Sequence, residues 1–148
     1  MTIEIQGRIA PECRLSFPKG SFELTGSLNA AGHSRIPLNL FCNSPFEYVV
    51  TSRYGHLQRE GLTGKAATVS DSVPYSMSVS VPTTAGISRM ECTSTAMTEG
   101  SGCLPSHSRG GVSTGGDATV DIRWNSTGRL PESGHYSDEL TFTVSAKL

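Results

Sequence analysis

The stretch from Leu140 to Leu148 alternates apolar and polar residues without a break. Its apolar members would share one face, and they are Leu140, Phe142, Val144, Ala146 and Leu148. A period of two sends successive side chains to opposite sides of a β-strand. We therefore predict a terminal strand with one apolar face, and no later strand follows that would pair with its far edge. An unpaired apolar strand edge attracts a strand from another chain.

The same alternation recurs upstream and predicts further strands. It covers residues 36–42, 46–50, 75–81 and 118–124, and residues 2–9 alternate as well around a gap at Gly7. Sixteen Gly and eight Pro, with many Ser and Thr between these runs, are typical of a chain with many turns. We therefore predict an all-β fold, an immunoglobulin-like β-sandwich of about seven strands. A single domain over residues 1–148 would hold it.

The residues between these runs predict how the strands connect. Asn43-Ser44-Pro45 is short, so the strands on either side are expected to pair as an antiparallel hairpin. Pro82 is expected to end the strand before it, because proline cannot donate to a ladder. Residues 66–69 are expected to form a short edge strand. Residues 83–117 are rich in Gly, Ser and Thr, and we expect one long loop pinned by a disulfide.

Charge and hydropathy exclude two classes of partner. Charged residues make up 17% of the chain, the net charge is −1, and Lys and Arg are scattered singly. Such a chain has no basic face for a phosphate backbone, so nucleic acid is not an expected partner. No apolar run reaches the roughly 18 residues of a membrane-spanning helix, and no leader peptide is present. A mature protein has lost its leader, so the compartment has to be inferred from the cysteines.

Four cysteines are present, and they are Cys13, Cys42, Cys92 and Cys103. An even number without a CxxC pair favours two disulfides and an oxidising compartment. Of the three possible pairings, one joins neighbours in sequence, Cys13 with Cys42 and Cys92 with Cys103. Cys42 shares the apolar face of residues 36–42, which makes a bridge to an inward Cys13 natural. We predict this pairing, with a purely structural role.

Neither metal binding nor catalysis is indicated by the residue pattern. The histidines stand alone in Gly- and Ser-rich turns without metal-ligand spacing, and they are His33, His56, His107 and His135. No serine lies in a Gly-x-Ser-x-Gly frame, and the Gly-rich residues 110–116 do not follow a strand and open a helix. The sequence therefore predicts no enzyme, no metal and no cofactor. A structural protein and a binding module remain.

Several short motifs, in their order along the chain, resemble those of chaperone–usher pilus subunits. They are Ile5-Gln6-Gly7-Arg8-Ile9 before Cys13-Arg14-Leu15, then Leu38-Asn39-Leu40-Phe41-Cys42 before residues 46–50, then Val73-Pro74-Tyr75-Ser76-Met77, and Gly134-His135-Tyr136-Ser137-Asp138 before the terminal strand. The order of these motifs and the placement of the cysteines carry the likeness. The chain is most similar to the spore coat protein U-like pilins.

The resemblance implies an incomplete immunoglobulin-like sandwich that lacks its last strand. In this family a periplasmic chaperone lends a strand before an outer-membrane usher assembles the fibre, where the N-terminal extension of a neighbouring pilin subunit replaces it. Cys13 and Cys42 would link the first two strands, and Tyr136 would open the last one. The implied groove for the donor strand is lined by Leu140, Phe142, Val144 and Ala146. The implied donor or first strand contains Ile3, Ile5, Gly7 and Ile9.

The sequence departs from the family pattern in two places. The pair Cys92 and Cys103 lies outside the usual pattern. Before Gly7 only Met1, Ile3 and Ile5 would serve as donor residues, too few for a full-length groove. Three explanations stay open: a trimmed N-terminus, a short donor, or the pilin domain of a two-domain tip adhesin.

The expected function is that of a structural subunit of an adhesive pilus, assembled by donor-strand exchange. Its expected location is the periplasm during assembly and the cell surface afterwards. Its expected partners are the chaperone, the usher and neighbouring pilin subunits. The alternative is an adhesin domain that binds a host receptor or an abiotic surface through residues 83–117.

Overall fold

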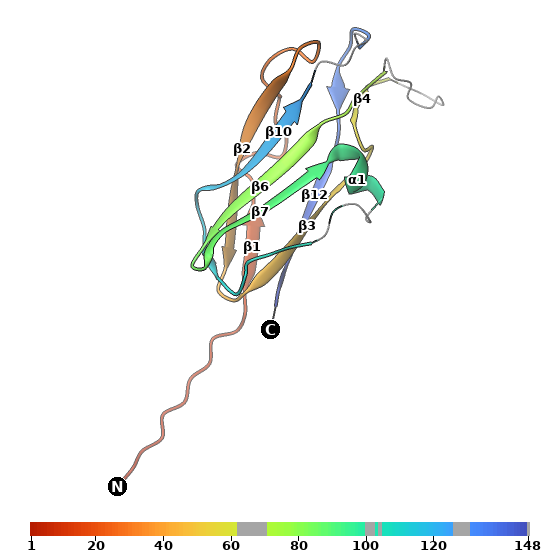
Figure 1. Ribbon diagram of the computed structural model, residues 1–148. Helices are drawn as coiled ribbons and strands as arrows, with labels where there is room; N and C mark the ends of the chain where they lie inside the picture. The colour runs from red at the N-terminus through yellow and green to blue at the C-terminus, as the bar shows by residue number, and fades with distance from the viewer. Residues whose placement is uncertain (62–70, 100–102, 104, 126–130, 148) are drawn as a thin grey trace.

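The computed structural model describes residues 1–61, 71–99, 103, 105–125 and 131–147. These residues form antiparallel β-sheets and one short helix, so the fold is all-β, as predicted (Figure 1). The first sheet has the strand order β1-β2-β10-β6-β7, and β9 also pairs with β2. Their bounds are β1 (Cys13–Ser16), β2 (Gly32–Cys42), β6 (Ser76–Thr83), β7 (Gly86–Thr93), β9 (Ser113–Thr114) and β10 (Ala118–Trp124).

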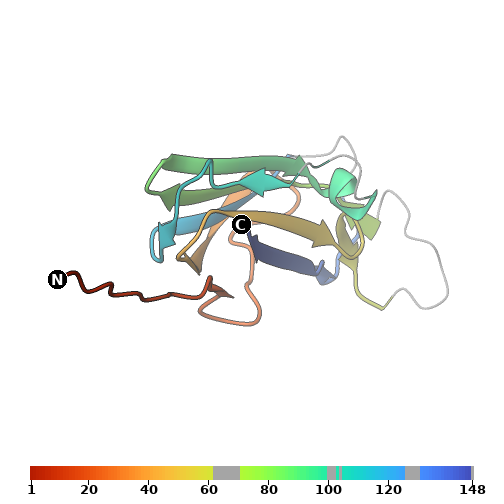
Figure 2. The same cartoon turned by 90° about the horizontal axis from the view of Figure 1, so that it is seen from below.

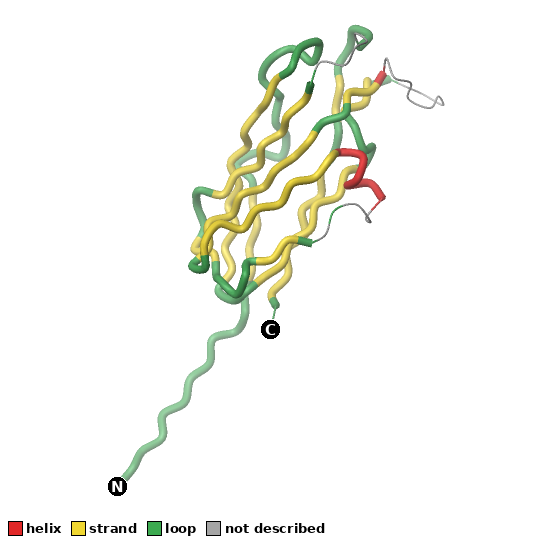
Figure 3. The backbone as a smooth tube through the Cα atoms, viewed as in Figure 1, coloured by secondary structure: helices red, strands yellow, loops and turns green. Residues whose placement is uncertain are grey.

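The second layer is built around β3 (Phe46–Ser52), which lies between β12 (Leu140–Ala146) and β8 (Ser106–His107). Beyond the end of β3, β4 (Leu57–Arg59) pairs with β5 (Ser72–Val73) and with β11 (Tyr136–Ser137). Figure 2 shows β3 and β12 facing the first sheet. The helix α1 (Ser94–Glu99) directly follows β7, and the rest of the described chain is strand and loop (Figure 3).

The core lies between the two layers and consists of the alternating positions predicted from the sequence. The most deeply buried apolar side chains include Leu38, Leu40, Phe46, Tyr48, Val50, Met77, Val79, Val81, Val120, Ile122 and Trp124. The polar residues between them, such as the serines of β6, lie on the outer face and are less buried. Burial of each large apolar side chain stabilises the fold by about 1.5–3 kcal/mol. The period of two therefore predicted correctly which face of each long strand is inside.

The predicted hairpin across Asn43-Ser44-Pro45 is wrong. β2 pairs with β1, β10 and β9, whereas β3 pairs with β12 and β8. The short turn carries the chain from one sheet to the other, and both strands keep their apolar faces toward the common core. Alternation shows which face of a strand is buried. It does not show whether two consecutive strands pair in one sheet or face each other from two sheets across the core.

Residues 83–117 do not form the predicted long loop. They contain β7, α1, β8 and β9, and β6 runs through Pro82, which lies opposite Ile87 in the β6–β7 ladder. The inward face of β7 carries Ser88 before Met90 and Cys92, while Ile87 on the outward face is 51% exposed. Because a serine points inward and an isoleucine points outward, the sequence of β7 does not alternate between apolar and polar residues, and the strand was not predicted. The predicted edge strand at 66–69 lies outside the described residues.

The predicted strand at residues 2–9 is also wrong, because residues 1–12 belong to no strand in the structure. They extend away from the sandwich as a single segment (Figures 1 and 3). The alternation is present, but a β-strand needs a partner for its backbone groups, and none lies beside this segment in the described structure.

Candidate functional site: the open edge of the sandwich

The strand β12 has a partner on only one side. It pairs with β3 over its whole length, from Leu140 opposite Ser52 to Ala146 opposite Phe46. Along its other side no described strand forms a ladder with it. In the facing sheet β1 is likewise a terminal strand, paired with β2 alone. We call the unpaired side of β12, which adjoins β1, the open edge.

Side-chain burial falls toward the open edge. The inward residues of β3, Phe46, Tyr48 and Val50, are each 1% exposed. The inward residues of β12 are only half-buried, although they continue the same apolar face, and they are Leu140, Phe142, Val144 and Ala146. These are the four residues predicted for the donor-strand groove. The structure places them on one face, next to an unpaired backbone.

Apolar side chains also line the open edge from the facing sheet. Leu15 of β1 and Phe17, just after β1, are half-buried and pack against the core. The Phe17 ring meets the Phe142 ring edge to face, with 5.1 Å between centroids. Two rows of partly exposed apolar residues, one from each sheet, therefore flank the unpaired side of β12. Phe17 was not among the predicted site residues, because no pattern within its own segment relates it to residue 142.

The opposite edge of the sandwich is closed by β8. This strand pairs with β3, where Ser106 lies opposite Tyr48, and it also reaches β7. The Ser88 hydroxyl donates to the His107 carbonyl at 2.8 Å, and the Ser106 hydroxyl donates to the Arg89 carbonyl at 3.2 Å. These hydrogen bonds tie the two sheets together, whereas among the described residues β1 and β12 are joined by side-chain packing and by no ladder.

The N-terminal segment carries the second half of the site. Its isoleucines are exposed to solvent, Ile3 by 78%, Ile5 by 91% and Ile9 by 87%. At Gly7 an added Cβ would find no atom within 4 Å. The exposure of these isoleucines to water is unfavourable, and their alternation is the pattern of a strand that lacks a sheet.

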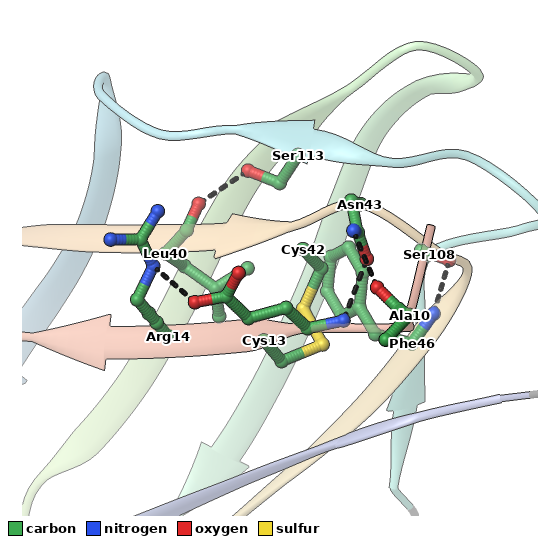
Figure 4. Close-up of a disulfide and its surroundings, with 10 residues drawn as sticks. Ala10, Cys13, Arg14, Leu40, Cys42, Asn43, Phe46, Ser108 and Ser113 are labelled. Carbon is green, nitrogen blue, oxygen red and sulfur yellow. Dashed lines mark hydrogen bonds and ion pairs between the residues drawn. A yellow bond between two sulfur atoms is a disulfide. The ribbon is translucent and has the colours of Figure 1, made fainter. Parts of the chain in front are cut away.

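Two disulfides brace the sandwich, with the pairing that the sequence predicted. Cys13 is joined to Cys42, its register partner across the β1–β2 ladder (Figure 4). Cys92 at the end of β7 is joined to Cys103. The first bridge fixes the start of β1, where the N-terminal segment ends, to β2, and the second joins Cys103 to the end of β7.

One carboxylate secures the start of β12. The Asp138 Oδ2 atom accepts hydrogen bonds from the Tyr75 hydroxyl and the Ser52 hydroxyl. Its Oδ1 atom accepts from the backbone N–H groups of Tyr54 and Glu139, at 3.1 and 2.8 Å. Asp138 therefore connects the entry of β12 with the end of β3 and with the residue before β6. Tyr136 lies in β11, and its hydroxyl donates to the Glu132 carbonyl at 2.6 Å.

The buried phenol of Tyr75 should make stability depend on alkaline pH. Burial first, and then the hydrogen bond to Asp138, raise the pKa of Tyr75 above its ordinary value of 10. The phenol ionises near pH 10 in the unfolded chain only, so its contribution is complete below that pH. Stability is then lost as pH rises toward the folded pKa, by at most about 1.4 kcal/mol per pH unit.

Tyr75→Phe should therefore make this dependence less steep, while the part due to Tyr48, whose pKa burial also raises, remains. The measurement is the free energy of unfolding in urea between about pH 8 and about pH 11. Tyr54→Phe is the matched control, because it removes a phenol from a ring that lies beside the Arg53 guanidinium. If both variants lose stability above pH 10 as steeply as the unmodified chain, the Tyr75 hydroxyl is not the group responsible.

In the part of the chain that the structure describes, no cluster of three His, Cys, Asp or Glu residues is arranged to hold a metal ion. No described helix has the length and apolar character needed to cross a bilayer. The open edge offers an apolar contact surface and the unpaired backbone of one side of β12. Comparison with protein-family models, with curated proteins and with solved structures finds no match for this chain.

Proposed function

We propose that this chain is a structural subunit of a fibre, assembled by exchange of a β-strand between copies. Residues 1–9 of one copy would dock along the free side of β12 in the next copy. One observation carries the proposal. In the described chain, one side of β12 is unpaired and is bordered by half-buried apolar residues, and the same chain carries an exposed segment with alternating isoleucines. The unpaired side of β12 needs a strand partner, and the N-terminal segment needs a sheet that covers its isoleucines.

The sheet order supports an immunoglobulin-like arrangement with one strand missing. In a complete domain of that type, strands A, B, E and D form one sheet and C, F and G form the other. The order β1-β2-β10-β6 corresponds to the first sheet, and β3-β12 corresponds to C and F. Strand G would then lie on the free side of β12. A strand supplied by another copy fits this position.

The lengths of the two segments also agree. β12 has seven residues, and residues 3–9 are seven as well. In the antiparallel register that sets Ile5 opposite Val144, Gly7 lies opposite Phe142. The missing side chain leaves room for the contact between Phe142 and Phe17, which are 5.1 Å apart. Docking would bury three isoleucines, each worth about 1.5–3 kcal/mol when fully buried. This favours the short-donor explanation for residues 1–9.

The location and the other partners follow from the same proposal. Two disulfides favour an oxidising compartment, so we place assembly in the periplasm and the fibre at the cell surface. An exposed apolar edge is an aggregation hazard before assembly. A periplasmic chaperone that covers β12, and an outer-membrane usher that orders the exchange, would meet this need. Receptor binding through residues 83–117 has less support, because much of that segment is strand and helix.

A deletion tests the proposal directly. The full chain should form oligomers whose size grows with concentration, as measured by size-exclusion chromatography with light scattering. A variant lacking residues 1–9 should remain monomeric and should bind a synthetic peptide of that sequence. At a hundredfold excess over its dissociation constant, the peptide should stabilise the variant by about 2.7 kcal/mol. A full chain that stays monomeric, together with a variant that ignores the peptide, contradicts the proposal.

A further inference from the structure

The side chain of Asn43 forms hydrogen bonds with residues 10 and 12, where the N-terminal segment joins the sandwich. Its Nδ2 atom donates to the Ala10 carbonyl at 3.0 Å, and its Oδ1 atom accepts from the Glu12 N–H at 2.7 Å (Figure 4). The Asn43 backbone N–H also donates to the Glu12 carbonyl at 3.1 Å. Both ends of one amide are therefore used, each on a different residue of the segment.

This contact lies at a stiff point of the fold. Asn43 directly follows Cys42, and Glu12 directly precedes Cys13, so the disulfide adjoins the contact. Pro11 lies between the two bonded residues, and its ring fixes the backbone torsion φ. The direction in which residues 1–9 leave the sandwich is thus set by the contact and by the proline. They point away from the open edge of their own copy (Figures 1 and 2).

A tethered strand is a strong competitor for the edge of its own copy. A segment joined by a short linker experiences an effective concentration of about a millimolar, far above that of other copies in dilute solution. β1 begins and β12 ends at the same end of the sandwich (Figure 1). To reach its own open edge, the segment would have to reverse at residues 10–12 and run parallel to β12. A second copy can dock its segment antiparallel, which is the slightly more stable pairing.

We propose that Asn43 is a positioning residue that prevents the segment from docking on its own copy and so directs it to another. This inference rests on the proposed function. Both hydrogen bonds of the amide hold residues 10–12 in the outward course, and a reversal at those residues breaks them. Each net hydrogen bond is worth about a factor of five, so the two together bias the choice by about 25-fold.

The test compares three variants of the full chain. Asn43→Ala removes both side-chain hydrogen bonds, and Asn43→Asp keeps the acceptor for the Glu12 N–H but loses the donor to Ala10. Asn39→Ala, at an exposed position of β2, the strand that ends one residue before Asn43, is the matched control. The readouts are the concentration at half assembly, from light scattering, and hydrogen exchange of β12 amides in the monomer fraction. Unfolding in urea measures stability separately.

We expect Asn43→Ala to raise the concentration at half assembly by up to about 25-fold, with β12 amides that become protected in the monomer. Asn43→Asp should fall between that variant and the unmodified chain, and Asn39→Ala should match the unmodified chain. If Asn43→Ala assembles normally, or is merely less stable with unprotected β12 amides, the positioning role is wrong while strand exchange stands. If the unmodified chain itself never assembles, the proposed function fails first.

Discussion

Replacing Phe142 by aspartate should abolish the docking of a donor strand along β12. The Phe142 ring is half-buried at the open edge and touches Phe17. A docked strand would cover this position, so the new carboxylate would have to lose its water without gaining a partner, at a cost of several kcal/mol. Full-length Phe142→Asp should therefore accept no strand. As long as no strand docks, the carboxylate at position 142 stays in contact with water, because this position is only half-buried.

The variant offers a sharper test than loss of assembly alone. It keeps its own residues 1–9, so it should still donate them to a normal copy. Added to the normal chain, it should occupy fibre ends and halt growth there, and oligomers should shorten as its share rises. Light scattering of mixtures measures this directly.

Thr143→Asp is the matched control for this change. Thr143 is the next residue of the same strand, and its side chain is exposed on the outer face. The Thr143→Asp substitution introduces the same charge without placing it at the open edge. Uptake of a donor strand and assembly should therefore continue. If both aspartates block assembly equally, net charge near β12 is the cause, and the open edge is not the docking site. If Phe142→Asp assembles normally, docking does not pass over Phe142.

The sequence predicted the faces of strands much better than their neighbours. Alternation depends on the boundary between core and solvent, which acts on each strand separately. The buried faces of β2, β3, β6 and β10 were therefore predictable. Which strand pairs with which depends on backbone contacts between distant segments. The turn at Asn43-Ser44-Pro45 is equally compatible with a hairpin and with the crossing between sheets that the structure contains.

Strands at the margins of the sandwich escaped prediction for a related reason. β7 carries an inward serine, and its polar group is satisfied by the His107 carbonyl rather than by water. Only the position of β8 makes that serine acceptable in the interior. For residues 2–9 the error is the opposite one, a strand predicted where none forms. Their pattern is that of a strand, but no partner lies beside them among the described residues. A segment that pairs only with another molecule would show this combination.

The candidate site was partly predictable as well. The apolar face of β12 follows from alternation alone, whereas its free side follows only from the complete sheet order. Phe17, Asn43 and Asp138 act through contacts with residues that lie far away in the sequence. A single sequence contains no local signal for such contacts. These three residues could be identified only once the fold was known.

Asp138→Ala should be among the most destabilising single substitutions outside the apolar core. Its carboxylate accepts four hydrogen bonds, and two of them come from the hydroxyls of Ser52 and Tyr75, residues that are only 7% and 5% exposed. Leaving a buried donor unsatisfied costs about 1–3 kcal/mol. With both hydroxyls affected, we expect a loss of about 3 kcal/mol or more in the free energy of unfolding.

Two comparisons separate this effect from a general loss of charge. Asp138→Asn keeps one carbonyl acceptor, and the Tyr75 hydroxyl can turn to accept from the new amide, so its loss should be smaller than that of alanine. Glu139→Ala removes the adjacent carboxylate, which is exposed and pairs with Arg53 at 3.2 Å across the surface. An exposed ion pair contributes less than about 1 kcal/mol. Urea unfolding should therefore give the lowest free energy of unfolding for Asp138→Ala. Asp138→Asn should be more stable, and Glu139→Ala should be the most stable of the three variants. Equal losses for Asp138→Ala and Glu139→Ala would mean that the buried hydroxyls find other partners, and that Asp138 does not secure the start of β12.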